Sequence, residues 1–212
     1  MSKHQLANAT EDMLYPPAQD AASNLMSLTF KRYIDNLRKG LQLLNEDGVL
    51  RLTQCLKRAF AENRQVFICG NGGSAANSIH IANDFLYGVG RHLGKGLRVH
   101  SLSANPAILT CLANDISYAE IYSEQLRTMA GEGDVLLILS GSGNSPNVLR
   151  ALETARELGM ETAALLGYDG GECLNCCDIP IHIKLDDMQV AEDVQVVVGH
   201  LLTRLLQEWS NE

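Results

Sequence analysis

Two turns rich in glycine and serine restrict the fold of this chain most, because each follows a short apolar run and precedes a helical pattern. The first spans residues 69–74 and reads Cys-Gly-Asn-Gly-Gly-Ser; the second spans residues 140–145 and reads Ser-Gly-Ser-Gly-Asn-Ser. A helix that begins at such a turn presents backbone N–H groups and the positive end of its dipole. Glycine lets an anion approach the backbone, and serine hydroxyls add donors. The two turns therefore predict a bound phosphate with a polar group beside it.

The second turn also allows a purely structural interpretation. Ser145 is a favoured type of N-cap and Pro146 suits the first helical position, so some of these serines could serve only to cap a helix. Six small polar residues in a row exceed what a cap requires. We therefore favour phosphate binding.

Apolar runs and helical patterns alternate along the chain, which is typical of a parallel sheet with helices on both faces. The predicted strands are residues 65–69, 97–102, 134–139, 161–166 and 179–183. The predicted helices are residues 25–44, 49–63, 74–87, 106–112, 118–129, 146–158 and 190–209. Right-handed crossovers then give an α/β fold: a three-layer αβα sandwich with a five-stranded parallel sheet, flavodoxin-like, plus N-terminal helices. Ligands of such sheets bind at the carboxyl ends of the strands, where both turns lie.

Length, charge and hydropathy narrow the class of protein. The 212 residues suffice for one sizeable domain, and we expect a flexible tail at residues 1–22 and a single domain at residues 23–212. The net charge is −8 without a basic stripe, which argues against direct binding of nucleic acid. The sequence has no apolar run of about 18 residues and no signal-peptide core, so we expect a cytoplasmic protein that does not span a membrane.

The six cysteines fall into two groups. Cys55, Cys69 and Cys111 lie in apolar patterns and are interpreted as buried thiols. Cys173, Cys176 and Cys177 form a cluster that could bind zinc, although a second cysteine pair is missing. The alternative is a short turn with small packed thiols in a reducing compartment.

Both turns, together with three further stretches, resemble the sugar isomerase (SIS) domain family. The further stretches are Asn114-Asp115, residues 132–137 (EGDVLL) and residues 167–171 (GYDGG). The resemblance covers residues 25–210 and extends to the phosphoheptose isomerase subfamily and to its noncatalytic relative, the DnaA initiator-associating protein. It implies the SIS fold and a phosphosugar ligand.

The resemblance also implies a set of substrate-binding residues. Serines of the second turn would hold the phosphate with help from Ser74, Asn71 would contact sugar hydroxyls, and Asp115 falls at an active-site position. Asp169 lies within a matching turn and is interpreted as structural. The full predicted set is Asn71, Gly72, Gly73, Ser74, Asp115, Ser140, Gly141, Ser142, Asn144 and Ser145.

Four further residues match the catalytic element of phosphoheptose isomerases. His80 and Asp84 are four residues apart and share a helix face, whereas Glu192 and His200 are eight apart on the last predicted helix. In one interpretation Asp84 is the base and His200 the acid of an enediol-type isomerisation. In the other, His80, Asp84, Glu192 and His200 together hold zinc. The structural alternatives are a buried histidine at position 200 and a surface hydrogen bond between His80 and Asp84.

The chain departs from the subfamily at several of these positions. Asp84 replaces a glutamate, Glu192 replaces a glutamine, and Gln195 stands where the family has another histidine. An expected arginine is absent, and Arg91 lies three residues after its place.

The leading hypothesis is an isomerase that converts sedoheptulose 7-phosphate to D-glycero-D-manno-heptose 7-phosphate. The alternative is a noncatalytic phosphosugar-binding adaptor of the initiator-associating type. We further expect a homotetramer with the N-terminal helices and the C-terminal helix in its interfaces and with sites between subunits.

Overall fold

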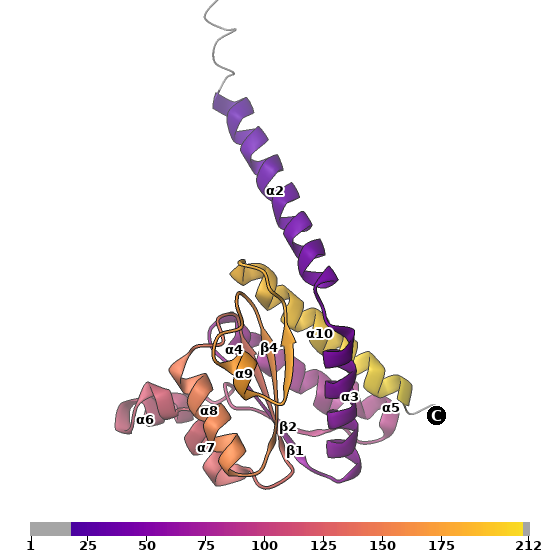
Figure 1. Cartoon of the computed structure of the whole chain (residues 1–212), viewed down its shortest axis with the longest axis vertical. Helices are drawn as coiled ribbons and strands as arrows, with labels where there is room; N and C mark the ends of the chain where they lie inside the picture. Colours follow the sequence, from indigo (N-terminus) through magenta and orange to yellow (C-terminus); the bar gives the residue numbers. More distant parts are fainter. Residues whose placement is uncertain (1–17, 210–212) are drawn as a thin grey trace, which may run out of the picture. The chain divides into compact units, whose positions relative to one another are not determined.

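The computed structural model describes residues 18–209, and the chain divides into two units between Lys39 and Gly40. Most of the predicted tail, residues 1–17, lies outside the described residues. The first helix, α2 (Ala18–Gln42), begins before the predicted position 25. The second unit holds the sheet and the helices around it (Figure 1).

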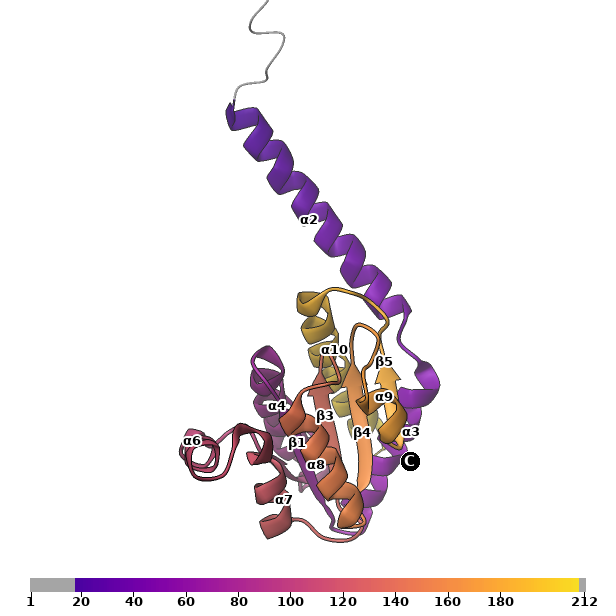
Figure 2. The ribbon, with the colours of Figure 1, turned by 60° about the vertical axis from the view of Figure 1, so that its left-hand side comes forward.

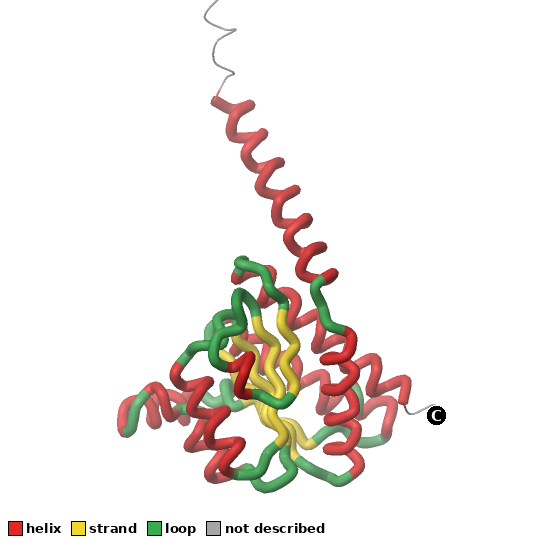
Figure 3. The backbone as a smooth tube through the Cα atoms, viewed as in Figure 1, coloured by secondary structure: helices red, strands yellow, loops and turns green. Residues whose placement is uncertain are grey.

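The second unit is built on a parallel sheet of five strands in the order β2-β1-β3-β4-β5. The strands are β1 (Gln65–Gly70), β2 (Arg98–Ser101), β3 (Val135–Ser140), β4 (Glu161–Leu166) and β5 (Ile179–His182). All neighbouring pairs are parallel, and Figure 3 shows the strands side by side. The predicted fold class is therefore confirmed, and the strand bounds agree within one residue.

Helices cover both faces of this sheet. The helices of the second unit are α3 (Glu46–Ala61), α4 (Gly73–Asn83), η1 (Asp84–Gly88), α5 (Gly90–Leu93), α6 (Pro106–Asp115), η2 (Tyr118–Glu120), α7 (Ser123–Met129), α8 (Pro146–Glu157), α9 (Cys173–Cys176) and α10 (Met188–Glu208). α10 packs against α3 and α4 on one face, whereas α7, α8 and α9 lie over the other (Figure 2). Local sequence sets the starts of these helices: Asn45 caps α3, Asn105 caps α6 ahead of Pro106, and Asp187 caps α10.

The predicted helix over residues 74–87 changes its winding at Asp84. The segment η1 is a π-helix in which Val89 N donates to Asp84 O over 2.9 Å. The cause is that Phe85 O accepts from Leu97 N instead, so the ordinary helical partner is taken. Gly96 is required here, because a Cβ at that position would collide with Leu86 O. The short helix α5 then leads the chain from η1 towards β2.

The core lies on both sides of the central strands. Leu136 and Ile138 of β3 face a cluster built from α7 and α8, to which Tyr122 and Leu126 contribute. Every residue of β3 is buried, as expected of a central parallel strand. Among the described residues, no helix combines the length and the apolarity needed to cross a membrane.

The cysteines are all free, and one prediction about them is wrong. Cys55 and Cys69 are buried as expected, but Cys111 is exposed, because it lies on α6, none of whose residues is buried. In the short helix α9, which the sequence patterns did not predict, burial raises the pKa of Cys173 to about 12. Within the described part of the chain, the cysteines contribute to no group of three metal-ligand side chains. Cys173 is buried and Cys177 half-buried, as packed thiols would be, whereas Cys176 is exposed.

Candidate active site

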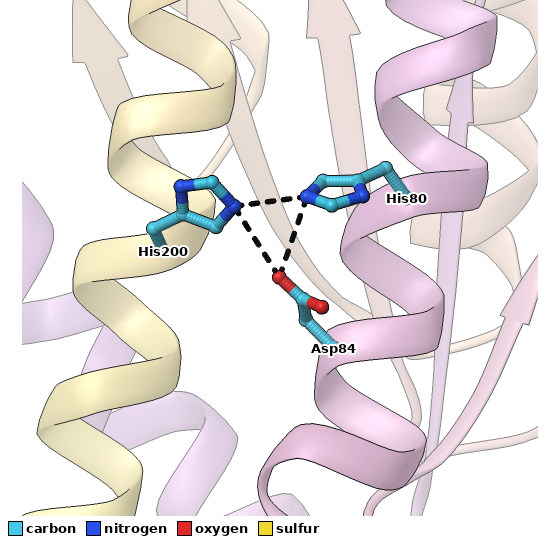
Figure 4. Close-up of side chains that lie close together, drawn as sticks. All are labelled: His80, Asp84 and His200. Carbon is cyan, nitrogen blue, oxygen red and sulfur yellow. Dashed lines mark hydrogen bonds and ion pairs between the residues drawn. The ribbon is translucent and has the colours of Figure 1, made fainter.

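Three of the predicted catalytic side chains converge on one point between two helices. His80 comes from α4, Asp84 opens η1, and His200 comes from α10 (Figure 4). The Nε2 atoms of the two histidines are 2.9 Å apart, and each lies 3.5 Å from Asp84 Oδ2. This His-Asp-His cluster therefore presents two imidazole nitrogens and one carboxylate to a common centre.

Close packing of α4 on α10 sets the distance between the two histidines. A Cβ on Gly199 would lie only 2.6 Å from Ile81 Cγ1, so a larger residue at position 199 would push the helices apart. Asn77 adds a polar link, because its Nδ2 donates to Glu192 O over 2.9 Å and to Gln195 Oε1 over 3.0 Å. Gln195, which replaces a family histidine, is thus buried and structural.

The cluster is open enough to meet a ligand. The side chains of His80 and His200 are 47% and 52% exposed, and that of Asp84 is 21% exposed. The alternative of a buried structural histidine at position 200 is therefore wrong. Two histidines and one carboxylate whose ligand atoms lie within 4.8 Å of one another fit the donor set of a zinc site with an open position.

Glu192 lies apart from this cluster, so the structure brings together three residues of the predicted four-residue set. It precedes His200 by two helical turns, about 12 Å of rise along α10. Its carboxylate lies against Gly73, where a Cβ would collide with it. Glu192 instead lines a cavity at the two glycine-rich turns.

That cavity, of about 250 Å³, lies where the ligand site of a doubly wound sheet is expected. The two turns follow β1 and β3, and the strand order reverses direction between these neighbouring strands. The cavity is lined by Asn71, Gly72, Ser74, Leu139, Ser140, Gly141, Ser142, Ser145, Met188 and Glu192. Seven of the ten predicted substrate-binding residues are in this lining, and we call it the phosphate cavity below.

Hydrogen bonds within the second turn hold its serines in place. Ser140 Oγ accepts from Gly143 N over 3.0 Å, and Ser142 Oγ accepts from Asn144 N over 3.3 Å. Each hydroxyl keeps its own proton to donate to an anion. Ser145 occupies the N-cap position of α8, yet its side chain makes no capping hydrogen bond. The purely structural interpretation of Ser145 is therefore not supported by its contacts.

Asn71 belongs to a network that sequence reasoning missed. Its Oδ1 accepts from Asn147 Nδ2 over 2.8 Å, from Tyr118 Oη over 3.1 Å and from Tyr122 Oη over 3.2 Å. Burial raises the pKa of Tyr122, so that its phenol remains a donor. No sequence motif indicated Asn147 or Tyr122, but both lie close to the glycine-rich turns in the fold. The network fixes the amide of Asn71 at the rim of the phosphate cavity.

The remaining predicted residues lie outside the phosphate cavity. Asp115 is exposed at the end of α6, where hydrogen bonds from Asn114 and Cys111 lower its pKa. Gly73 lies behind the carboxylate of Glu192, and Asn144 lines a different cavity. Arg91 lies beside the ring of Tyr87, 5.7 Å from its centroid, and lines no part of the phosphate cavity.

The fold and the two glycine-rich turns define a doubly wound α/β protein with a cavity at its switch point. Residues 29–167 match the SIS domain. The chain belongs to the SIS domain family, within which its relatives are phosphoheptose isomerases.

Two curated relatives are phosphoheptose isomerases from bacteria. The protein of Clostridium acetobutylicum is 36% identical over 162 residues, which cover 76% of this chain and 82% of the relative. That of Helicobacter pylori is 36% identical over 180 residues, or 84% of this chain and 92% of the relative. Among solved structures, the phosphoheptose isomerase of Neisseria gonorrhoeae superposes with a TM-score of 0.79 at 24% identity, covering 87% of this chain and 99% of that one.

Proposed function

We propose that this chain is a phosphoheptose isomerase that interconverts sedoheptulose 7-phosphate and D-glycero-D-manno-heptose 7-phosphate. The observation that carries the proposal is the convergence of His80, Asp84 and His200 on one point, in a chain whose relatives bear that name. Its second support is a phosphate cavity at the carboxyl ends of β1 and β3.

Phosphate binding falls to the second turn in this proposal. The hydroxyls of Ser140, Ser142 and Ser145 donate to phosphate oxygens at the start of α8, where the helix dipole favours an anion. Ser74 adds a donor from the start of α4. Asn71 exchanges hydrogen bonds with sugar hydroxyls. The carboxylate of Glu192 accepts hydrogen bonds from further sugar hydroxyls, because it suits hydroxyl groups better than a second anion.

The isomerisation moves one proton between two adjacent carbons. Asp84 takes the proton from the carbon beside the carbonyl, and the electron pair of the broken C–H bond forms the enediol while His200 protonates the carbonyl oxygen. Return of the proton to the other carbon, with loss of the hydroxyl proton, gives the product carbonyl. Aspartate is one methylene shorter than the family's glutamate, so the substrate must sit closer to the η1 backbone.

The His-Asp-His cluster also suits zinc, which would polarise the oxygens of the sugar when bound. His80, Asp84 and His200 would be its protein ligands, and Glu192 would not be one. With zinc bound, His80 would act as a ligand only, whereas Asp84 would remain the base for the substrate proton.

We further propose that residues 23–212 act as one SIS domain in a cytoplasmic homotetramer, with residues 1–22 as a tail. Apolar side chains on α2 and α10 support self-association: Leu25 and Phe30 are 64% and 69% exposed, and Val197 is 40% exposed. A monomer in light scattering at micromolar concentration would contradict this assembly.

Turnover of sedoheptulose 7-phosphate by the purified chain tests the proposed reaction. We expect the aldose product to accumulate until equilibrium is reached. Tight binding of the phosphosugar without any turnover would instead favour the noncatalytic adaptor.

A further inference from the structure

A larger cavity, of about 580 Å³, adjoins the phosphate cavity and has no part in the proposed reaction. Its lining consists of Ser142, Asn144, Tyr168, Asp169, Lys184 and Asp186. These residues come from the loops that follow β3, β4 and β5, at the same edge of the sheet as the phosphate cavity. The two cavities share Ser142, and no member of the His-Asp-His cluster lines either of them.

The lining of this second cavity is organised before any ligand arrives. Tyr168 has a left-handed backbone with φ of 45°, and its N donates to Leu185 O over 3.1 Å. His182 Nε2 lies 3.0 Å from Tyr168 O, which ties the loops after β4 and β5 together. Asp169 Oδ1 accepts from Gly171 N over 3.2 Å. These bonds fix the loop backbone at Tyr168 and the side chain of Asp169, so both lose little freedom when a ligand binds.

The charges of the second cavity select the kind of group that enters it. Asp169 and Asp186 oppose a single ammonium, that of Lys184, so a further phosphate inside the cavity would be repelled. Carboxylates accept hydrogen bonds from neighbouring hydroxyls, as an acidic residue does on the ribose of dinucleotides. The half-buried ring of Tyr168 offers an apolar surface for a planar base. A neutral, hydroxyl-rich group with an aromatic end fits these features.

We propose that the second cavity binds the nucleoside part of a nucleoside monophosphate whose phosphate sits on the second turn at Ser142. The ribose hydroxyls bond to Asp169 and Asp186, and the base stacks on Tyr168. The inference rests on the proposed function only in that the second turn holds phosphate. Such a ligand places its phosphate on the second turn and therefore competes with the phosphosugar. It does not contact the His-Asp-His cluster and is therefore not isomerised.

Calorimetry with AMP, ribose 5-phosphate and inorganic phosphate tests the proposal, together with inhibition of turnover by AMP. We expect AMP to bind about tenfold more tightly than ribose 5-phosphate, because stacking of the base adds affinity. AMP should inhibit competitively against sedoheptulose 7-phosphate. Tyr168→Asn should remove the tenfold advantage of AMP and leave the KM for the phosphosugar within about twofold, since asparagine tolerates the left-handed backbone.

A pair of matched variants controls for charge. Asp186→Asn should lower the affinity for AMP severalfold. Asp47 is an exposed carboxylate on α3, and Asp47→Asn should leave the affinity for AMP unchanged. If both ligands bind and AMP binds no more tightly than ribose 5-phosphate, the result would overturn only the claim that the second cavity binds a nucleoside. If AMP, ribose 5-phosphate and inorganic phosphate all fail to bind, both the nucleotide proposal and the assignment of phosphate binding to the phosphate cavity are wrong.

Discussion

The Nε2 atoms of His80 and His200 lie 2.9 Å apart, although 120 residues separate the two histidines in the chain. Helices α4 and α10 bring them together, and the helices can approach because position 199 has no side chain. The geometry of the cluster therefore depends on a glycine that is not itself a member of the cluster.

Replacement of that glycine should disturb the cluster from outside it. In Gly199→Ala the new Cβ meets Ile81, so we expect the free energy of unfolding to fall by about 1–3 kcal/mol and zinc affinity to fall with it. Urea denaturation and zinc titration measure the two effects. Gly131→Ala is the control, because a Cβ at position 131 meets no atom within 4 Å. Equal zinc affinity in Gly199→Ala and wild type would show that the helix spacing does not set the cluster.

The second turn should contribute more to phosphosugar binding than other exposed or half-buried serines do. Ser142→Ala removes a donor to the phosphate, and a hydrogen bond to a charged group contributes about 1.5–3 kcal/mol, or a loss of at least about tenfold. Ser101→Ala is the comparison, since Ser101 Oγ is engaged with Ser78 Oγ over 2.7 Å. Calorimetry with sedoheptulose 7-phosphate separates the two variants, and equal affinities would count against the phosphate assignment.

Zinc content should distinguish the three-residue site from the predicted four-residue set. His80→Ala removes one of two imidazole ligands, so the variant should lose zinc that the wild type retains. Glu192→Gln should retain zinc at the wild-type level, because its side chain lies against Gly73. Metal analysis of the purified proteins gives both values. Loss of zinc in Glu192→Gln would instead show that Glu192 is a fourth zinc ligand.

The fold was predictable because its signals are local. Each strand is a short apolar run, and caps such as Asn105 with Pro106 mark helix starts directly in the sequence. Where three-dimensional contacts decide the structure, the sequence patterns fell short. The π-helix at Asp84 depends on a hydrogen bond to Phe85 O from Leu97 N, a residue twelve positions after Phe85 that no helical periodicity reports.

The candidate site was predicted in the same uneven way. His80 and Asp84 share a face by their spacing, and the glycine-rich turns identified the phosphate cavity by composition. Glu192 lies in the phosphate cavity and not with the histidines, because two helical turns separate it from His200. Tyr122 was not predicted, since its hydrogen bonds to Gly70 O and Asn71 join residues more than 50 positions apart and exist only in the folded chain.

Turnover of sedoheptulose 7-phosphate by wild type and by Asp84→Asn tests the central claim most directly. Asparagine keeps the shape of aspartate but removes the base, and loss of general-base catalysis costs about 10²–10⁴ in rate. We predict that the wild type interconverts the ketose and aldose phosphates, whereas Asp84→Asn loses turnover by that factor and binds the phosphosugar within about twofold of wild type. A wild-type protein that binds the phosphosugar and never turns it over, or an Asp84→Asn variant with full activity, would contradict the account.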